Sequence, residues 1–547
     1  MDGYKQTVKS KQKTMNNKVT SLILLLIIVL GAGIRLFWLD KSPPSLNWDE
    51  AALGYNAYSL LKTGKDEYGF KLPITFRSFD DYKPPLYPYV TIPFIAIFDL
   101  NELSVRLPSA LSGISIIVAV FFIASHFFNK KIAILAAFFI AIEPWSVHFS
   151  RIAFETNLGL SFLLWSIFFA LKAKQKQKYL YISFFLLFLS AYSYHAYRAL
   201  LLPLTSYYLY INKTILKAKS RFFPLLIFIS LFLTSFIFII KSGGGLVRFQ
   251  TTSILKAVEF EKTFNPVSLI YQLYILGKNI IGRYLAYFSP INLFVRGTNE
   301  PNQQIPGFGP FHTIEFIFFL AGVVYLAKNN FKPRFFTFLI LLAPLPAIIT
   351  WNWFLPTRVL LIFSMYSILI GLGAYNTIGL LRKKGKIIQF TGITIFSIIL
   401  LNNLGNLATT LFLYLPYSQK GNWQYGFREI MANVTPIQEN YDQIIFETGH
   451  AQPHIFVLFY GKYSPERYHK DLGSPDAVEK PRKNFNFGNY VFRKIYWPED
   501  RNLKKTLFIG SEYNLPEKDV ATAKNAKILK DIYDKNGDFM GRIVETK

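Results

Sequence analysis

The sequence predicts an all-α polytopic membrane domain followed by a small α/β domain. Three observations predict it: many long apolar runs, basic residues gathered between those runs, and a polar C-terminal stretch with alternating helix and strand patterns. The chain has 547 residues, of which 52% are hydrophobic and 17% aromatic. Apolar runs of this length and number are typical of membrane-spanning helices.

Residues 20–34 form the first apolar run and follow a basic, polar start. A cleaved signal peptide is the alternative interpretation of this segment. No small-residue cleavage site follows, because the next stretch, 35–44, is bulky and ends in proline. We therefore interpret residues 20–34 as a retained membrane helix.

The formal net charge is +27, which by itself is compatible with nucleic-acid binding. The basic residues, however, concentrate in short segments between apolar runs, and Asp2 is the one acid within them. This is the positive-inside pattern, which places these segments in the cytoplasm. The segments are 1–18, 129–131, 172–178, 212–221, 328–334 and 382–386. The basic charge thus indicates a multi-pass protein of the cell (plasma) membrane, and no nucleic-acid partner.

With these segments in the cytoplasm, the sequence predicts about 11 transmembrane helices, a cytoplasmic N-terminus and an extracytoplasmic C-terminus. Two short helices within 179–211 are preferred to one, because a single helix would place the basic segment 212–221 outside. The predicted helices are 19–38, 106–127, 131–146, 154–172, 179–194, 198–211, 222–240, 311–327, 335–350, 357–381 and 387–413.

The predicted domains are a cytoplasmic segment 1–18, a membrane domain 19–416 and an extracytoplasmic α/β domain 417–547. The first outer loop is 39–105, and a second large outer loop is 241–310. Surface helices are expected at 48–62, 85–98 and 266–289, from their apolar spacing and the helix-opening Pro84–Pro85. In the C-terminal domain, helices are expected at 423–434 and 454–463, strands at 442–449, 489–497 and 505–510, and a hairpin at 527–546 around Asn536–Gly537.

The first outer loop contains Asn-Trp-Asp-Glu at 47–50, just beyond the first helix. Carboxylates beside a bilayer are costly to desolvate and are often functional. Asp49 has the side chain of a general base. The alternative is structural: Asn47 and Glu50 have the spacing of a capping box, and Asp49 suits the first turn of a helix.

Cations are predicted on the same outer face, where they are suited to binding a phosphate. They are Lys83, Arg106 and Arg151. Arg198 and Arg358 are further candidates for a lipid phosphate, or else interface anchors. The chain has no cysteine, which excludes disulfides, thiolate metal sites and thiol nucleophiles.

The Asp-Glu pair after the first helix, the Lys-Pro-Pro-Leu segment 83–86 and the Arg-Leu-Pro-Ser-Ala-Leu segment 106–111 resemble GT-C glycosyltransferases. The nearest group is the family of protein O-mannosyltransferases and lipid A aminoarabinose transferases. The resemblance implies a GT-C fold, with Asp49 as the base and Lys83 on the donor phosphate. It also implies a second catalytic acid at Glu155, where relatives usually carry Asp. One departure is Ala52, where aminoarabinose transferases carry arginine.

The predicted function is that of an inverting glycosyltransferase. It would move a monosaccharide, a hexose or a pentose, from a polyprenyl-phosphate carrier to an acceptor hydroxyl of a protein, lipid or glycan in the cell envelope. Protein glycosylation is one such outcome. The alternatives are a transporter or flippase, which intramembrane charges and broken helices would favour, and a non-catalytic assembly or receptor protein.

Three further residues are candidates for an acceptor or sugar site. Glu143 is a candidate or else a solvated helix end, and His195 and Tyr197 lie at the turn between two short helices. No cofactor is required by this chemistry. A divalent ion at Asp80 and Asp81 is left open, because a lone acidic pair does not define a metal site.

Overall fold

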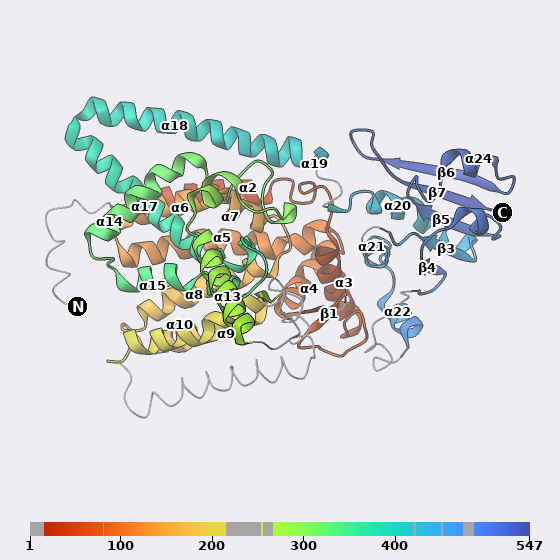
Figure 1. Cartoon of the computed structure of the whole chain (residues 1–547), viewed down its shortest axis with the longest axis horizontal. Helices are drawn as coiled ribbons and strands as arrows, with labels where there is room; N and C mark the ends of the chain where they lie inside the picture. Colours follow the sequence, from red (N-terminus) through yellow and green to blue (C-terminus); the bar gives the residue numbers. More distant parts are fainter. Residues whose placement is uncertain are drawn as a thin grey trace.

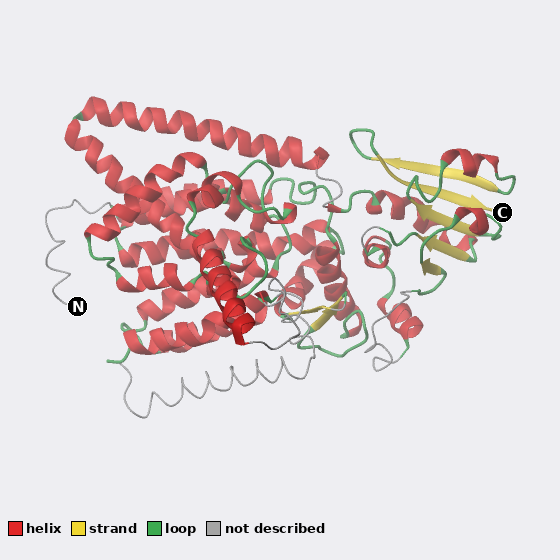
Figure 2. Cartoon of the chain, in the orientation of Figure 1, coloured by secondary structure: helices red, strands yellow, loops and turns green. Residues whose placement is uncertain are grey.

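The computed structural model describes residues 16–79, 81–214, 253–254, 266–418, 423–449, 452–473 and 486–547. Figure 1 shows a bundle of helices on one side and a sheet with short helices on the other, at the C-terminal end. Figure 2 shows the same division by secondary structure, with a short two-stranded ribbon as well between the two parts. The predicted all-α membrane part and strand-containing C-terminal part are both present.

The bundle helices follow the predicted order along the chain. Each begins or ends within a few residues of its prediction, and the predicted helix 222–240 lies outside the described residues. The helices are α2 (Asn17–Leu36), α5 (Glu102–Phe127), α6 (Lys130–Ile142), α7 (Pro144–Ser150), α8 (Glu155–Lys172), α9 (Lys178–Ser193), α10 (Arg198–Ile211), α13 (Pro266–Ala286), α14 (Phe316–Lys328), α15 (Arg334–Leu342), α16 (Leu345–Ile348), α17 (Leu360–Lys384), α18 (Lys386–Thr409) and α19 (Leu415–Ser418).

Four described helices are long and apolar enough to cross a membrane: α2, α5, α17 and the continuous helical stretch Lys386–Tyr417. The bent pair α6 and α7 adds a fifth if it forms one span. The predicted number of about 11 spans is therefore not confirmed. Other predicted helices are present but short, such as α9 with 16 residues and α14 with 13.

One predicted helix, 131–146, is wrong as a single element. The structure ends α6 at Ile142 and begins α7 at Pro144, with a bend of 59°. Proline disfavours helical backbone at the residue before it, and Glu143 accordingly has φ −60° and ψ 134°. The bend places Glu143 between the two helices.

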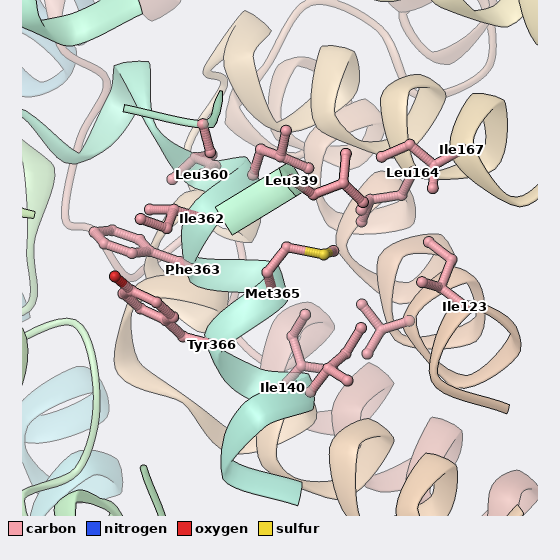
Figure 3. Close-up of a cluster of buried hydrophobic side chains, with 14 of the residues drawn as sticks. Ile123, Ile140, Leu164, Ile167, Leu339, Leu360, Ile362, Phe363, Met365 and Tyr366 are labelled. Carbon is pink, nitrogen blue, oxygen red and sulfur yellow. The ribbon is translucent and has the colours of Figure 1, made fainter. Parts of the chain in front are cut away.

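The core of the bundle is a continuous cluster of apolar side chains around α17. Met365 lies among Ile140, Leu164 and the other labelled side chains from neighbouring helices in Figure 3. Every residue from Leu360 to Ala374 is buried, so α17 is enclosed on all sides. A helix that is apolar all round is expected at the centre of such a bundle.

The first outer loop contains the expected surface helices, α3 (Trp48–Thr63) and α4 (Leu86–Phe98). Between them lies a ribbon of β1 (Phe76–Ser78) and β2 (Asp81–Lys83), paired antiparallel with Phe76 opposite Lys83. The predicted helix 266–289 is present as α13. Much of α3 is buried, because it packs between the bundle and the C-terminal part.

The C-terminal sheet has the order β4-β3-β5-β7-β6, with β3 parallel to β4 and β5 and the hairpin β6–β7 antiparallel. Gly537 in the hairpin turn has a φ of +85°, which glycine adopts readily. The strands are β3 (Gln443–Phe446), β4 (Tyr490–Phe492), β5 (Thr506–Gly510), β6 (Ala526–Tyr533) and β7 (Phe539–Thr546), with helices α20 (Phe427–Val434), α21 (Pro453–Tyr460), α22 (Pro465–Leu472), α23 (Trp497–Asp500) and α24 (Glu517–Thr522).

Helix α21 packs directly on α3, and the two parts share one hydrophobic core. Gly54 permits the close approach, since a Cβ there would lie 2.6 Å from both the Phe459 and Val105 side chains. The Tyr55 hydroxyl donates to the Tyr463 carbonyl at 3.0 Å. The C-terminal part therefore fixes the helix that carries the Asp-Glu pair.

Candidate functional site

The first turn of α3 is built by the predicted capping box. The Asn47 side chain accepts from the Glu50 backbone N–H at 2.9 Å, and the Glu50 carboxylate accepts from the Asn47 N–H at 3.1 Å. These bonds satisfy two N–H groups that a helix start leaves without intrahelical partners. The capping interpretation of Asn47 and Glu50 is confirmed.

Glu50 and Arg106 form a fully buried ion pair behind this turn. The Arg106 Nε–Glu50 Oε1 distance is 3.0 Å, and both side chains have no exposed surface. Glu50 also accepts from the Ala153 backbone N–H at 2.9 Å. The remaining Arg106 N–H groups donate to Glu50 and to the carbonyls of Leu39, Pro43 and Ser45.

All five N–H groups of Arg106 are thus used inside the chain. A donor phosphate could reach this guanidinium only if these bonds broke. The contacts give Arg106 a role in shaping the entry to α3, and its phosphate contact stays a prediction. In the same way, Glu50 is committed to Arg106 and to the cap, away from solvent.

Asp49 differs from its neighbour because its side chain faces outward and is 40% exposed. Lys83, at the end of β2, places its ammonium 2.5 Å from Asp49 Oδ1, with its own side chain 10% exposed. The β1–β2 ribbon brings this lysine across from a point 34 residues away. The structure therefore joins the predicted base and the predicted phosphate cation.

A second acidic pair lies behind Lys83, in the turn after α3. Asp66 is 1% and Glu67 is 3% exposed. Burial raises the pKa of Asp66 to about 7. Burial, with the nearby Asp66, raises the pKa of Glu67 to about 8, against the opposing effect of Lys83. Sequence reasoning missed this pair, because Lys-Asp-Glu in a loop resembles an ordinary solvated turn.

His195 and Tyr197 lie next to the same ribbon and the start of α8. His195 Nε2 donates to the Tyr82 carbonyl, one residue before Lys83, at 2.8 Å. The Tyr197 hydroxyl donates to the Thr156 carbonyl at 3.0 Å. Glu155, the first residue of α8, is 8% exposed and lies beside Thr156.

Arg358 follows in this chain of contacts. The Thr156 hydroxyl donates to the Thr357 carbonyl at 2.7 Å, which brings the start of α8 against the short 3-10 helix Pro356–Arg358. Arg358 is half-buried, and within the described residues its Nη1 has no hydrogen-bond partner. Asp49 and Lys83 are thus in direct contact, and His195 bonds to the residue before Lys83. Glu155 and Arg358 lie next in sequence to Thr156 and Thr357, which bond to each other.

Arg151 and Arg35 belong to the buried interior. Arg151 donates to the carbonyls of Ile34, Arg35, Trp38 and Ser42. Arg35, which sequence reasoning missed, donates to the carbonyls of Gly31, Ile140 and Ala141 and to Ser146 and Ser150. Both side chains hold the helix ends together. Arg151 thus has structural contacts, and its phosphate contact stays a prediction.

Glu143 is fully buried at the bend between α6 and α7, so the solvated interpretation of this residue is wrong. Its Oε2 accepts from Trp145 Nε1 at 2.9 Å and from the Ser367 hydroxyl at 2.5 Å. Arg198 donates through Nε to the Ala191 carbonyl at 3.2 Å, across the turn between α9 and α10. These contacts hold Glu143 at the bend and Arg198 at the turn between the two helices.

No group of three or more His, Asp or Glu side chains that could hold a metal ion occurs among the described residues. Asp80 lies outside them, and Asp81 begins β2. The question of a divalent ion at the Asp80–Asp81 pair therefore stays a prediction.

The comparisons agree with the resemblance found in the sequence. Residues 82–239 match the family model described as dolichyl-phosphate-mannose-protein mannosyltransferase. The structure of ArnT from Cupriavidus metallidurans bound to undecaprenyl phosphate is 12% identical, with a TM-score of 0.51 over 97% of this chain and 98% of that chain. No curated protein matches the sequence.

A second solved structure is similar at a lower level. It is the archaeal oligosaccharyltransferase AglB from Archaeoglobus fulgidus in complex with an inhibitory peptide and a dolichol-phosphate. It is 14% identical, covers 81% of this chain and 64% of that chain, and has a TM-score of 0.47. The membrane part of the chain has the GT-C fold. The family match over residues 82–239 and the shared fold support the predicted resemblance to the GT-C glycosyltransferases.

Proposed function

We propose that the protein transfers a monosaccharide from a polyprenyl-phosphate donor to an acceptor hydroxyl, with inversion at the anomeric carbon. The observation that carries the proposal is the Asp49–Lys83 pair at the exposed start of α3, with 2.5 Å between the charged groups. Two similar structures, those of ArnT and AglB, hold undecaprenyl phosphate and dolichol-phosphate respectively. A polyprenyl-phosphate donor is consistent with both.

Asp49 acts as the general base in this proposal. The acceptor oxygen attacks the anomeric carbon while Asp49 takes the hydroxyl proton, and the bond from that carbon to the phosphate oxygen breaks. A single displacement of this kind inverts the configuration. Proton transfer to a positioned carboxylate typically contributes about 100- to 10,000-fold to a rate.

The leaving phosphate needs cations rather than an acid, since its charge develops as the bond breaks. Lys83 supplies the first. When the donor phosphate binds Lys83, it competes with Asp49 for the ammonium and leaves the carboxylate available to accept a proton. Arg358 is the second candidate, because its half-buried guanidinium retains a buried N–H without a partner among the described residues.

We place the reaction on the extracytoplasmic face of the plasma membrane. The support is the distribution of basic segments, which assigns the first outer loop to the face opposite 129–131 and 382–386. Reporter fusions after residues 176, 384 and 547 test this placement. The expected result is a cytoplasmic reporter at the first two positions and an external one at the third, and a cytoplasmic C-terminus would contradict it.

The activity test uses purified full-length protein in lipid nanodiscs with labelled polyprenyl-phosphate hexoses and pentoses. The sugar passes to an added acceptor mixture or to water, and the polyprenyl phosphate released is measured by mass spectrometry. Wild-type protein should release it from at least one donor, and Asp49→Asn should not. If no donor is consumed by wild-type protein under any acceptor condition, the proposed activity is wrong.

A further inference from the structure

A polar pocket lies away from Asp49, between α18 and the loop that precedes α14. Its volume is about 460 Å³, within the range of small-molecule sites. One wall consists of the loop around Phe308 and Phe311. The other consists of Asn403 and Asn406 from the end of α18, with Thr410 directly after it. Among the described residues that line it, none is Asp, Glu, Lys or Arg.

The loop wall is tightly formed. Gly309 lies against the preceding segment, and a Cβ there would be 2.8 Å from the Leu293 carbonyl oxygen. The Phe311 N–H donates to the same carbonyl at 3.0 Å. Close packing and backbone bonding hold the wall in place, so the pocket does not depend on a ligand for its shape.

His312 anchors this wall to the neighbouring helices. The residue is 1% exposed and lines the pocket. Its Nε2 lies 3.1 Å from the Ile142 carbonyl oxygen, and a carbonyl only accepts, so Nε2 carries the proton. The His312 side chain also forms a capping box with Glu315, whose carboxylate accepts from the His312 N–H at 3.2 Å. The ring therefore belongs to the helix cap and fixes the wall in place.

The opposite wall is a polar cluster on an otherwise apolar helix. The start of α18 exposes Ile387 and Phe390 at 83% and 74%, as expected beside lipid tails. About 20 residues at 1.5 Å each cross the hydrocarbon core, so a helix that starts at Lys386 reaches the opposite interface near Gly405. Asn403, Asn406 and Thr410 therefore lie at the level of lipid head groups.

We propose that this pocket binds a neutral sugar group, as the head group of a membrane glycolipid or as part of a free glycan. The amide and hydroxyl side chains of the lining match the alternating donors and acceptors of sugar hydroxyls. The phenylalanines match the apolar C–H faces of the ring. The absence of charge along the described lining disfavours a phosphate group. This site is separate from Asp49 and does not depend on the proposed transfer reaction.

The test measures retention of two tritiated probes by the full-length protein. Monoglucosyl diacylglycerol is presented in phosphatidylcholine nanodiscs, and methyl β-glucoside is added in solution. Saturable binding of the lipid probe alone supports a head-group site, and binding of both supports a general sugar site. Asn406→Ala should weaken binding about tenfold, the effect of about 1.4 kcal/mol. Asn402→Ala removes the same kind of amide one helical turn away, outside the pocket, and should leave binding unchanged.

Three results would overturn the proposal: no saturable binding of either probe, equal effects of Asn406→Ala and Asn402→Ala, or equal displacement by the anionic phosphatidylglycerol. Thr410→Val provides a second pocket variant, which replaces a hydroxyl with a methyl group of similar size. The Asp49→Asn protein should bind both probes as wild type does, so a failure of the transfer reaction leaves this test intact.

Discussion

The buried arginines and Lys83 form two groups of cations near the start of α3, and their surroundings differ. Arg35 and Arg106 are fully buried and donate all five of their N–H groups within the chain. Lys83 contacts the carboxylate of Asp49, which is 40% exposed. The first group stabilises the chain, and the second is positioned to meet a ligand. Position along the sequence does not distinguish them.

The same contrast divides two adjacent acids. Glu50 and Asp49 are consecutive, yet one points into the protein toward Arg106 and the other toward solvent and Lys83. Successive residues of a helix project about 100° apart, so a helix at a boundary separates its neighbours into two environments. In this chain the boundary is the surface between the bundle and the first outer loop.

The largest expected effect is on folding. Arg106→Met removes one partner of a buried ion pair and leaves the Glu50 charge without compensation, which costs about 3–5 kcal/mol. We expect the yield of monodisperse protein and its melting temperature in detergent to fall sharply. Lys83→Met should keep both near wild type, because Asp49 remains partly hydrated. Equal melting temperatures for the two variants would contradict the claim that Arg106 stabilises the fold and Lys83 does not.

The second effect is on donor use. Lys83→Ala removes a charge-assisted contact with the donor phosphate, and we expect the apparent affinity for the donor to fall by about tenfold or more. Lys83→Arg should restore part of it, since the two cations differ in geometry. Lys62→Ala, an exposed lysine at the other end of α3, is the control. Donor kinetics of Lys83→Ala that match those of Lys62→Ala would reduce Lys83 to a structural partner of Asp49.

A smaller effect concerns pH and the acids behind Lys83. Burial raises the pKa of Glu67 from 4.5 to about 8, so between these values the folded chain binds a proton that the unfolded chain releases. Stability should therefore fall as the pH rises from about 5 to about 8. Glu67→Gln should make stability depend less on pH, and the remaining dependence should be the smaller contribution of Asp66. The check is the melting temperature at both pH values.

The exposed Glu439 gives the matched control, since Glu439→Gln should leave the pH slope unchanged. Lys83, Arg77, Asp66 and Tyr68 are the charged or titratable groups that act on Glu67. A Glu67→Gln protein with the slope of wild type would show that Glu67 is ionised in the folded chain throughout this range.

The sequence was sufficient for the local elements. Apolar runs located the helices, the Asn47–Glu50 spacing predicted the capping box, and Asn536–Gly537 predicted the hairpin between β6 and β7. The lengths of the helices were less predictable. A helix of 13 residues such as α14 shows the same apolar pattern as a segment of a longer helix. The bend at Glu143 had a local signal in Pro144, which the apolar run concealed.

Long-range contacts account for most of what was not predicted at the site. Whether an arginine donates to carbonyls or to a ligand depends on backbone from other helices, as with Arg106 and Leu39 or Pro43. The packing of α21 on α3 at Gly54 joins residues some 400 positions apart. The residue pattern within one segment does not show which distant residues that segment will contact.

The central claim is that Asp49 is the base and Glu50 is structural. Asp49→Asn and Glu50→Gln each replace one carboxylate by an amide of the same size, so the two adjacent residues serve as controls for each other. The measurement is the transfer rate per folded molecule, with the melting temperature of the same samples. Asp49→Asn should lower the rate by about a hundredfold or more with an unchanged melting temperature. Glu50→Gln should lower the melting temperature and largely keep the rate. Full activity of Asp49→Asn would contradict the mechanism.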